Sequence, residues 1–201
     1  MVTTLLPRLQ GYRIVLASNS PRRRELLAGL GLQFEVRVLP HITESFPQDL
    51  PTEQVAEFIA REKAAAYQPL IQPRELVITA DTIVVVDGQV LGKPADAADA
   101  RRMLRLLSGR SHEVVTGVTV TTRERTEAFS CISKVEFDRL TDDEIDYYVA
   151  RYAPMDKAGA YGIQEQACLF ISGITGDYYG VMGLPLFKLG ILLEKAGLKL
   201  L

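Results

Sequence analysis

Several short segments carry side chains that suit phosphate chemistry, beginning with Ser18-Asn-Ser-Pro-Arg-Arg-Arg-Glu25. Ser20 followed by Pro21 is typical of a helix start. The arginines that follow are cations in the first helical turn, where they oppose the helix dipole. Backbone N–H groups, hydroxyls and guanidinium groups at one helix start make a cradle for an anionic phosphate. A capped surface helix with solvated arginines fits the same pattern, so both interpretations stay open.

A carboxylate interrupts an apolar run in Thr79-Ala80-Asp81-Thr82. The residues on either side, from Leu76 to Val86, are otherwise apolar or β-branched, and a buried carboxylate without a partner is costly. In open α/β sheets, ligands bind at the carboxyl ends of strands. We therefore favour a role for Asp81 in holding a divalent metal or a water over the alternative, an aspartate that caps a turn.

Two lysines lie in segments that are ordinary when taken alone. Glu62-Lys63 falls within an amphipathic helix pattern, where a solvated charged face is the simpler interpretation. Lys93, in Leu91-Gly-Lys-Pro94, follows the two-residue hairpin signal Asp87-Gly88. A hairpin there returns the chain towards Asp81 and brings a cation near the carboxylate. The alternative is a plain loop lysine.

Residues 154–164 combine small residues with one amide side chain. The glycines allow the backbone to approach a ligand closely, and Gln164 offers both a donor and an acceptor to the edge of a nucleobase. A glycine-containing turn without a ligand fits equally well. His41 and His112 lie in no metal-ligand spacing, so we expect both to be loop or packing residues. The chain contains neither a P-loop nor a G-x-G-x-x-G fingerprint.

Strand and helix patterns alternate along the chain and must position these segments. Apolar or alternating runs predict strands at 13–17, 34–39, 76–80, 83–86, 90–91, 114–122, 128–137 and 169–174. Amphipathic spacing and caps predict helices at 22–30, 52–67, 97–107, 141–152 and 185–196. Thr141-Asp-Asp-Glu144 has the pattern of a capping box at the start of the fourth of these helices. Interleaved strands and helices with at least one hairpin predict an α/β fold with a mixed β-sheet.

Composition excludes several classes of protein. The 201 residues are 47% hydrophobic and 24% charged, with a formal charge of -2, which argues against disorder and against a general nucleic-acid binder. No apolar run approaches the roughly 18 residues of a membrane span. The two cysteines cannot build a disulfide scaffold or a zinc site, and the first ten residues lack the features of a signal peptide. We expect a cytoplasmic protein.

Taken together, the motifs resemble the Maf family of nucleoside triphosphate pyrophosphatases over about residues 12–196. They occur in this order: Ser18-Asn-Ser-Pro-Arg-Arg-Arg-Glu-Leu-Leu27, Arg61-Glu-Lys-Ala64, Ala80-Asp-Thr82, Gly92-Lys-Pro94, Leu107-Ser-Gly109, Thr116-Gly117, Met155-Asp-Lys-Ala-Gly-Ala-Tyr-Gly-Ile-Gln164 and Gly183-Leu-Pro-Leu186. The resemblance implies an elongated mixed sheet flanked by helices with a central cleft, related to the inosine triphosphate pyrophosphatases. Residues 1–12 are predicted from the sequence to be an N-terminal extension. The resemblance implies a single domain at 13–201, with two lobes around the cleft.

The resemblance also implies the reaction and its catalytic residues. A nucleoside triphosphate is hydrolysed between its α- and β-phosphates with the help of a divalent cation, Mg²⁺ or Mn²⁺. Asp81 is the expected general base or metal-bound carboxylate, and Glu44 is expected to support the metal. Lys63 and Lys93 are expected to contact phosphates or the attacking water. A homodimer is expected by analogy, with no nucleic-acid polymer and no membrane as partner.

Substrate-binding positions follow from the same resemblance. Ser18, Arg22 and Arg23 are expected to hold the triphosphate. The positions of Arg23, Thr82 and Gln164 separate the family's subtypes, and this trio resembles the subtype that acts on dTTP and UTP. The alternatives are a pyrophosphatase for 7-methyl-GTP or other modified nucleotides, and a nucleotide-binding regulator of septum formation or division arrest.

Overall fold

The structure is a computed structural model that describes residues 11–40, 42 and 44–196. Most of the predicted N-terminal extension, and His41, therefore lie outside the described residues. Among the helices that the structure describes, none is both long enough and apolar enough to cross a bilayer.

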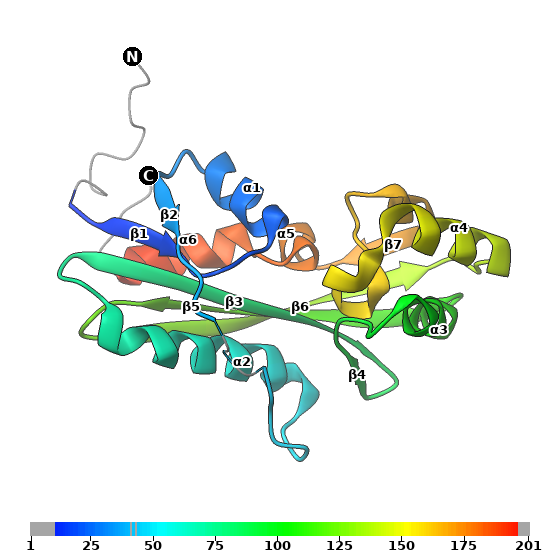
Figure 1. Cartoon of the computed structure of the whole chain (residues 1–201), viewed down its shortest axis with the longest axis horizontal. Coiled ribbons are helices and arrows are strands. Elements are labelled where there is room, and N and C mark those ends of the chain that lie inside the picture. Colours follow the sequence, from blue (N-terminus) through cyan, green and yellow to red (C-terminus); the bar gives the residue numbers. More distant parts are fainter. Residues whose placement is uncertain (1–10, 41, 43, 197–201) are drawn as a thin grey trace. The chain divides into compact units, whose positions relative to one another are not determined.

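Strands and helices are interleaved along the chain, and Figure 1 labels the strands and the α-helices. The strands are β1 (Arg13–Leu16), β2 (Phe34–Val36), β3 (Glu75–Val86), β4 (Gln89–Leu91), β5 (Ser111–Thr121), β6 (Thr126–Phe137) and β7 (Ile171–Thr175). The α-helices are α1 (Pro21–Gly29), α2 (Thr52–Tyr67), α3 (Ala97–Leu107), α4 (Asp142–Tyr152), α5 (Tyr178–Met182) and α6 (Leu186–Lys195). Short 3-10 helices are η2 (Gln68–Leu70), η3 (Pro154–Asp156), η4 (Ala158–Ala160) and η5 (Gln166–Phe170).

The strands form one mixed sheet in the order β2-β1-β3-β5-β6-β7, with β4 paired to β3. β1 pairs in parallel with β2 and with β3, whereas β4 is antiparallel to β3 and β7 is antiparallel to β6. The β3–β4 hairpin turns at Asp87 and Gly88, both of which have positive φ. The predicted mixed α/β fold and its hairpin are confirmed.

The prediction that a strand ends at Ala80 is wrong. β3 is a single strand of 12 residues that runs through Asp81 and Thr82 to Val86. β-branched and apolar residues on both sides favour extended backbone, and Asp81 is tolerated within the strand because its carboxylate has a charged partner, described below. The carboxylate therefore lies inside a strand and not at its carboxyl end.

Chain contacts divide the protein into two compact units. The first contains the described residues up to Asp81 together with residues 116–130 and 183–196. One of its core clusters consists of Val15, Ala17, Tyr67, Ile71 and Val77. The Tyr67 hydroxyl donates to the Arg37 carbonyl at 2.7 Å, which fixes the end of α2 against the segment that follows β2.

The second unit contains residues 82–115 and 131–182. Helices α3 and α4 pack against each other and contribute to its apolar core. His112 is 2% exposed and its ring packs edge-on against Phe137 and Tyr161, so its predicted packing role is confirmed. The predicted capping box opens α4: the Glu144 N–H donates to Thr141, and the Thr141 N–H donates to Glu144.

Candidate active site

Lys63 lies between two carboxylates in the first unit. Its Nζ donates to Asp81 Oδ1 at 2.7 Å and is also 2.7 Å from Glu44 Oε1. The side chains of Lys63 and Asp81 are each 12% exposed, whereas that of Glu44 is 43% exposed. The cluster is therefore enclosed around the Lys63–Asp81 bond and open to solvent at Glu44. Three of the predicted catalytic residues meet here.

The packing of α2 on the sheet brings Lys63 to Asp81. Thr79 lies two residues before Asp81, so both side chains point to the same face of β3. Thr79 Oγ1 donates to the Ala60 carbonyl of α2 at 2.7 Å, and Lys63 is one turn further along the helix. A Cβ at Gly117 of β5 would lie 2.3 Å from the Ala56 carbonyl carbon. Only glycine allows the helix backbone to approach the sheet this closely.

Arg23 connects the start of α1 to the strand that carries Asp81. Its Nη1 donates to the Ala80 carbonyl at 3.0 Å and to Ser18 Oγ at 3.3 Å, and its Nε donates to the Gly183 carbonyl at 2.8 Å. Burial lowers the pKa of Arg23, and the charge of Asp81 acts in the opposite direction. A guanidinium keeps its proton in proteins, so Arg23 is a cation bonded to the residue next to Asp81.

The start of α1 has the predicted cap. Ser20 is the N-cap, its hydroxyl accepts from the Arg23 N–H, and Pro21 occupies the first turn. Ser18 is buried and its Oγ accepts from the Ser20 N–H at 3.2 Å. Arg22 is half-buried. Ser18 and Arg23 therefore lie together, and their link to Ala80 places them beside the strand position of Asp81.

The remaining predicted residues belong to the second unit. Thr82 is half-buried in β3, and its side chain points to the face opposite that of Asp81 because strand residues alternate. Lys93 is exposed just beyond β4. Gln164 is exposed in the segment between η4 and η5. A backbone hydrogen bond links the segment that carries Lys93 to the segment that leads to Gln164, since the Gly159 N–H donates to the Gly92 carbonyl at 3.1 Å.

The donor set suits a divalent cation that arrives with a phosphate ligand. Among residues 11–40, 42 and 44–196, no three or more His, Cys, Asp or Glu side chains gather as a metal site. Asp81 and Glu44 nevertheless supply two carboxylates that converge on one Lys63 ammonium. Mg²⁺ is commonly held by one or two carboxylates together with substrate phosphates and water. Two carboxylates fit that mode.

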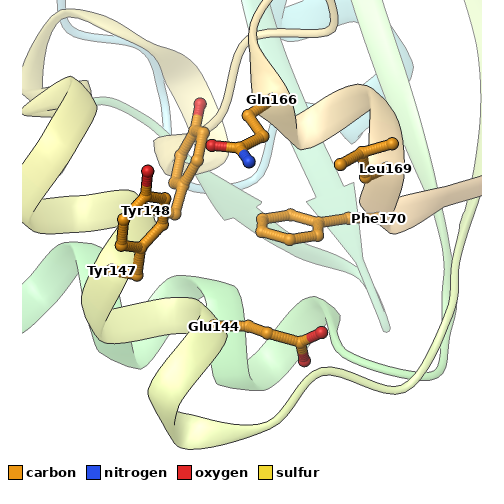
Figure 2. Close-up of a pocket in the computed structure, with 6 residues that line it drawn as sticks. All are labelled: Glu144, Tyr147, Tyr148, Gln166, Leu169 and Phe170. Carbon is orange, nitrogen blue, oxygen red and sulfur yellow. The ribbon is translucent and has the colours of Figure 1, made fainter.

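A pocket lies in the second unit, and one of its lining residues, Gln166, is only two positions from Gln164 in the chain. Figure 2 shows its lining side chains, from α4 and η5: Glu144, Tyr147, Tyr148, Gln166, Leu169 and Phe170. Tyr147 and Leu169 are exposed, and the floor is aromatic. None of the residues predicted from the sequence to act on a nucleotide lines it.

Sequence reasoning missed two contributors to these regions. The Gly183 carbonyl accepts a hydrogen bond from Arg23. The sequence identified Gly183 only as part of a family motif and did not predict its contact with Arg23. Lys157 is buried with its Nζ between carboxylates, whereas the sequence indicated only a segment of small residues. The adjacent acidic residue Asp156 was the one local signal of an ion pair there.

Comparison with known proteins assigns the chain to a family. The family model described as Maf-like protein matches residues 13–196. The chain belongs to the Maf family. Among its relatives in this family, the dTTP/UTP pyrophosphatase of Bacteroides thetaiotaomicron is 54% identical, with 92% of this chain and 96% of the relative covered. That of Phocaeicola vulgatus is 53% identical, with 95% of this chain and all of the relative covered (100%).

More distant matches extend the comparison. The dTTP/UTP pyrophosphatase of Aromatoleum aromaticum is 47% identical, with 92% of this Maf-family chain and 96% of the relative covered. The solved structure of a HAM1 protein from Coxiella burnetii aligns with 92% of this chain and 99% of its own at a TM-score of 0.45 and 18% identity.

Proposed function

We propose that this Maf-family chain hydrolyses dTTP and UTP to the nucleoside monophosphate and pyrophosphate. The observation that carries the proposal is the cluster in which Lys63 Nζ lies 2.7 Å from carboxylate oxygens of both Asp81 and Glu44. Its support is the high identity to relatives named dTTP/UTP pyrophosphatase across nearly their whole length.

Asp81 is proposed as the general base. Lys63 donates to one carboxylate oxygen, which fixes the orientation of the group and leaves the other oxygen to accept from a water. As the water oxygen bonds to the α-phosphorus, its proton passes to Asp81 and the bond to the bridging oxygen of pyrophosphate breaks. The Lys63 ammonium offers positive charge where negative charge builds on the phosphate oxygens.

A divalent cation, Mg²⁺ or Mn²⁺, is proposed as the cofactor, with Asp81 and Glu44 as the residues that would hold it. When bound, such an ion neutralises phosphate charge and polarises the phosphoryl oxygens. The ion pairs of Lys63 with both carboxylates hold the two groups together, so the proposed ligands are already gathered before a nucleotide arrives.

The other predicted residues are proposed to hold the substrate. Ser18, Arg22 and Arg23 would attract the triphosphate to the start of α1, where backbone N–H groups favour anions. Lys93 is proposed to contact a phosphate. Gln164 is proposed to read the base edge, because its amide offers both a donor and an acceptor. Thr82 is proposed to contribute to subtype selectivity.

A panel of nucleoside triphosphates with a pyrophosphate readout, run with Mg²⁺ and with Mn²⁺, tests the proposal. We expect dTTP and UTP to be preferred over 7-methyl-GTP. Asp81→Asn should lower kcat at least about a hundredfold, while Glu57→Gln, which alters a half-buried carboxylate of α2 paired with Arg61, should not.

Three results of these measurements would contradict parts of the proposal. Preference for 7-methyl-GTP would overturn the subtype. Tight nucleotide binding without release of pyrophosphate would favour the regulator of septum formation. Near-normal hydrolysis by Asp81→Asn would refute the assigned base.

We further propose the cytoplasm as the compartment. Cys131 is buried and Cys168 is exposed, and neither forms a disulfide in the structure, which supports a reducing environment. The homodimer stays a prediction.

A further inference from the structure

Lys157 is a buried lysine that the proposed chemistry does not use. Its side chain is 7% exposed, and its Nζ lies 2.7 Å from Asp156 Oδ1 and 3.0 Å from Glu165 Oε1. Lysine is almost never this buried unless its charge is paired. The ammonium is therefore fixed in place by two carboxylates from opposite ends of one short segment, residues 156–165.

Glu165 is held from its other side by α4. The Tyr148 hydroxyl donates to Glu165 Oε2 at 2.7 Å and accepts from the Gly162 N–H at 3.1 Å. Tyr148 is 1% exposed, and its ring lies beside that of Phe170 (Figure 2). The segment from Lys157 to Glu165 is thus closed into a ring by its end side chains and is attached to helix α4 through Tyr148. We call this ring the Lys157 clamp.

The backbone inside the Lys157 clamp has little freedom. A Cβ at Gly162 would lie 2.9 Å from Lys157 Cε, so the lysine stem passes directly over the Gly162 backbone. Ala160 holds φ at 62°, a left-handed conformation that L residues disfavour. Such a conformation persists only where the surrounding structure fixes it, and the closed ring does so.

The Lys157 clamp determines where two proposed functional residues lie. Gln164 directly precedes Glu165 and is exposed, so its backbone position is set by the Glu165 anchor. A Cβ at Gly159 would lie 2.8 Å from Val84 Cγ2, and the Gly159 N–H donates to the Gly92 carbonyl, next to Lys93. The same segment that presents Gln164 therefore also contacts the turn that presents Lys93.

We propose that Lys157 is a positioning residue for nucleobase selection: its ion pair with Glu165 holds Gln164 where the amide reads the base edge. The inference rests on the proposed pyrophosphatase activity. A side chain that only stabilised the fold would change the amount of active enzyme, and that amount cancels when two substrates are compared on one sample. Selectivity is therefore the quantity that separates positioning from stability.

The test compares kcat/KM for dTTP with kcat/KM for dATP in the full-length protein. Lys157→Met keeps the stem over Gly162 and removes the charge, and it should lower the dTTP-to-dATP ratio about tenfold, since small misplacement of a binding group is costly. In a Gln164→Ala background, Lys157→Met should lower the ratio no further, because the lysine acts through the glutamine. Arg105→Met, which breaks an exposed ion pair with Asp142 in the same unit, should leave the ratio unchanged.

Glu165→Gln gives a second, independent measurement if Lys157→Met does not fold. It removes the other charge of the pair, retains an acceptor for Tyr148, and should lower the ratio to a similar extent. If the wild type is active and the dTTP-to-dATP ratio is unchanged in either variant, the positioning role of the Lys157 clamp is wrong, while the proposed function stands. The same holds if Lys157→Met lowers the ratio further in the Gln164→Ala background. A wild type that releases no pyrophosphate from dTTP or UTP would overturn the proposed function itself and the positioning role with it.

Discussion

Acid should destabilise this protein through His112, a residue outside the proposed chemistry. The imidazole is 2% exposed, its Nε2 lies 2.8 Å from the Tyr161 hydroxyl, and its Nδ1 meets no hydrogen-bond partner among the described residues. Burial lowers the pKa of His112 from 6.5 to about 4. The folded protein therefore holds the ring neutral at a pH where the unfolded chain protonates it.

The sign and size of the effect follow from that difference in pKa. The unfolded state binds the extra proton first, so this contribution to stability is complete above about pH 6.5 and is lost as the pH falls towards 4. A pKa lowered from 6.5 to about 4 corresponds to about 3 kcal/mol of unfolding free energy in full, and to about 2 kcal/mol already lost at pH 5.

Urea unfolding between pH 7.5 and 4.5, for the wild type and for His112→Gln, measures this term. Glutamine does not titrate in that range and retains an acceptor or donor for the Tyr161 hydroxyl, so the difference between the two curves isolates His112. We expect the wild type to lose about 2 kcal/mol more than the variant between pH 7.5 and 5. Parallel curves, or a His112 NMR titration with a midpoint above 6, would refute the reasoning.

Three further substitutions test the packing that surrounds the site. Gly117→Ala places a Cβ 2.3 Å from the Ala56 carbonyl carbon, so α2 must shift; we expect about 3 kcal/mol of destabilisation and reduced turnover, and an unchanged melting temperature would contradict this. Thr141→Ala removes the hydroxyl that accepts from the Glu144 N–H and should lower the unfolding free energy by about 1 kcal/mol in urea, with turnover kept. Glu75→Gln removes the charge of a carboxylate that is 1% exposed and bonded to two arginines. The unfolding free energy in urea should fall by about 2 kcal/mol, and a change near zero would mean that solvent replaces these bonds.

Local sequence patterns predicted most elements but not the path of β3. The caps at Ser20 and Thr141 depend on residues within one turn of the helix, and both were predicted. The strand through Asp81 was not, because a carboxylate inside a strand is tolerated only when a distant partner neutralises it. That partner, Lys63, comes from a different element, so no local window around Asp81 contains the information.

The candidate site was predicted in part, and through the family resemblance more than through spacing. The meeting of Lys63 with Asp81 depends on how close α2 lies to the sheet, which Gly117 permits and which helix periodicity alone does not reveal. The burial of Lys157 depends on Glu165 and on α4, and neither contact leaves a periodic signal in the sequence. Side chains that act across elements are thus the part that local patterns miss.

The unbroken course of β3 limits how this chain can change its length. Within β3, the residues up to Asp81 belong to the first unit and the residues from Thr82 onwards belong to the second. Side chains alternate between the two faces of a strand, so one inserted residue between them would exchange the faces of every residue from Thr82 to Val86. Insertions and deletions should therefore accumulate in the loops of homologous chains, while the spacing across this junction stays fixed.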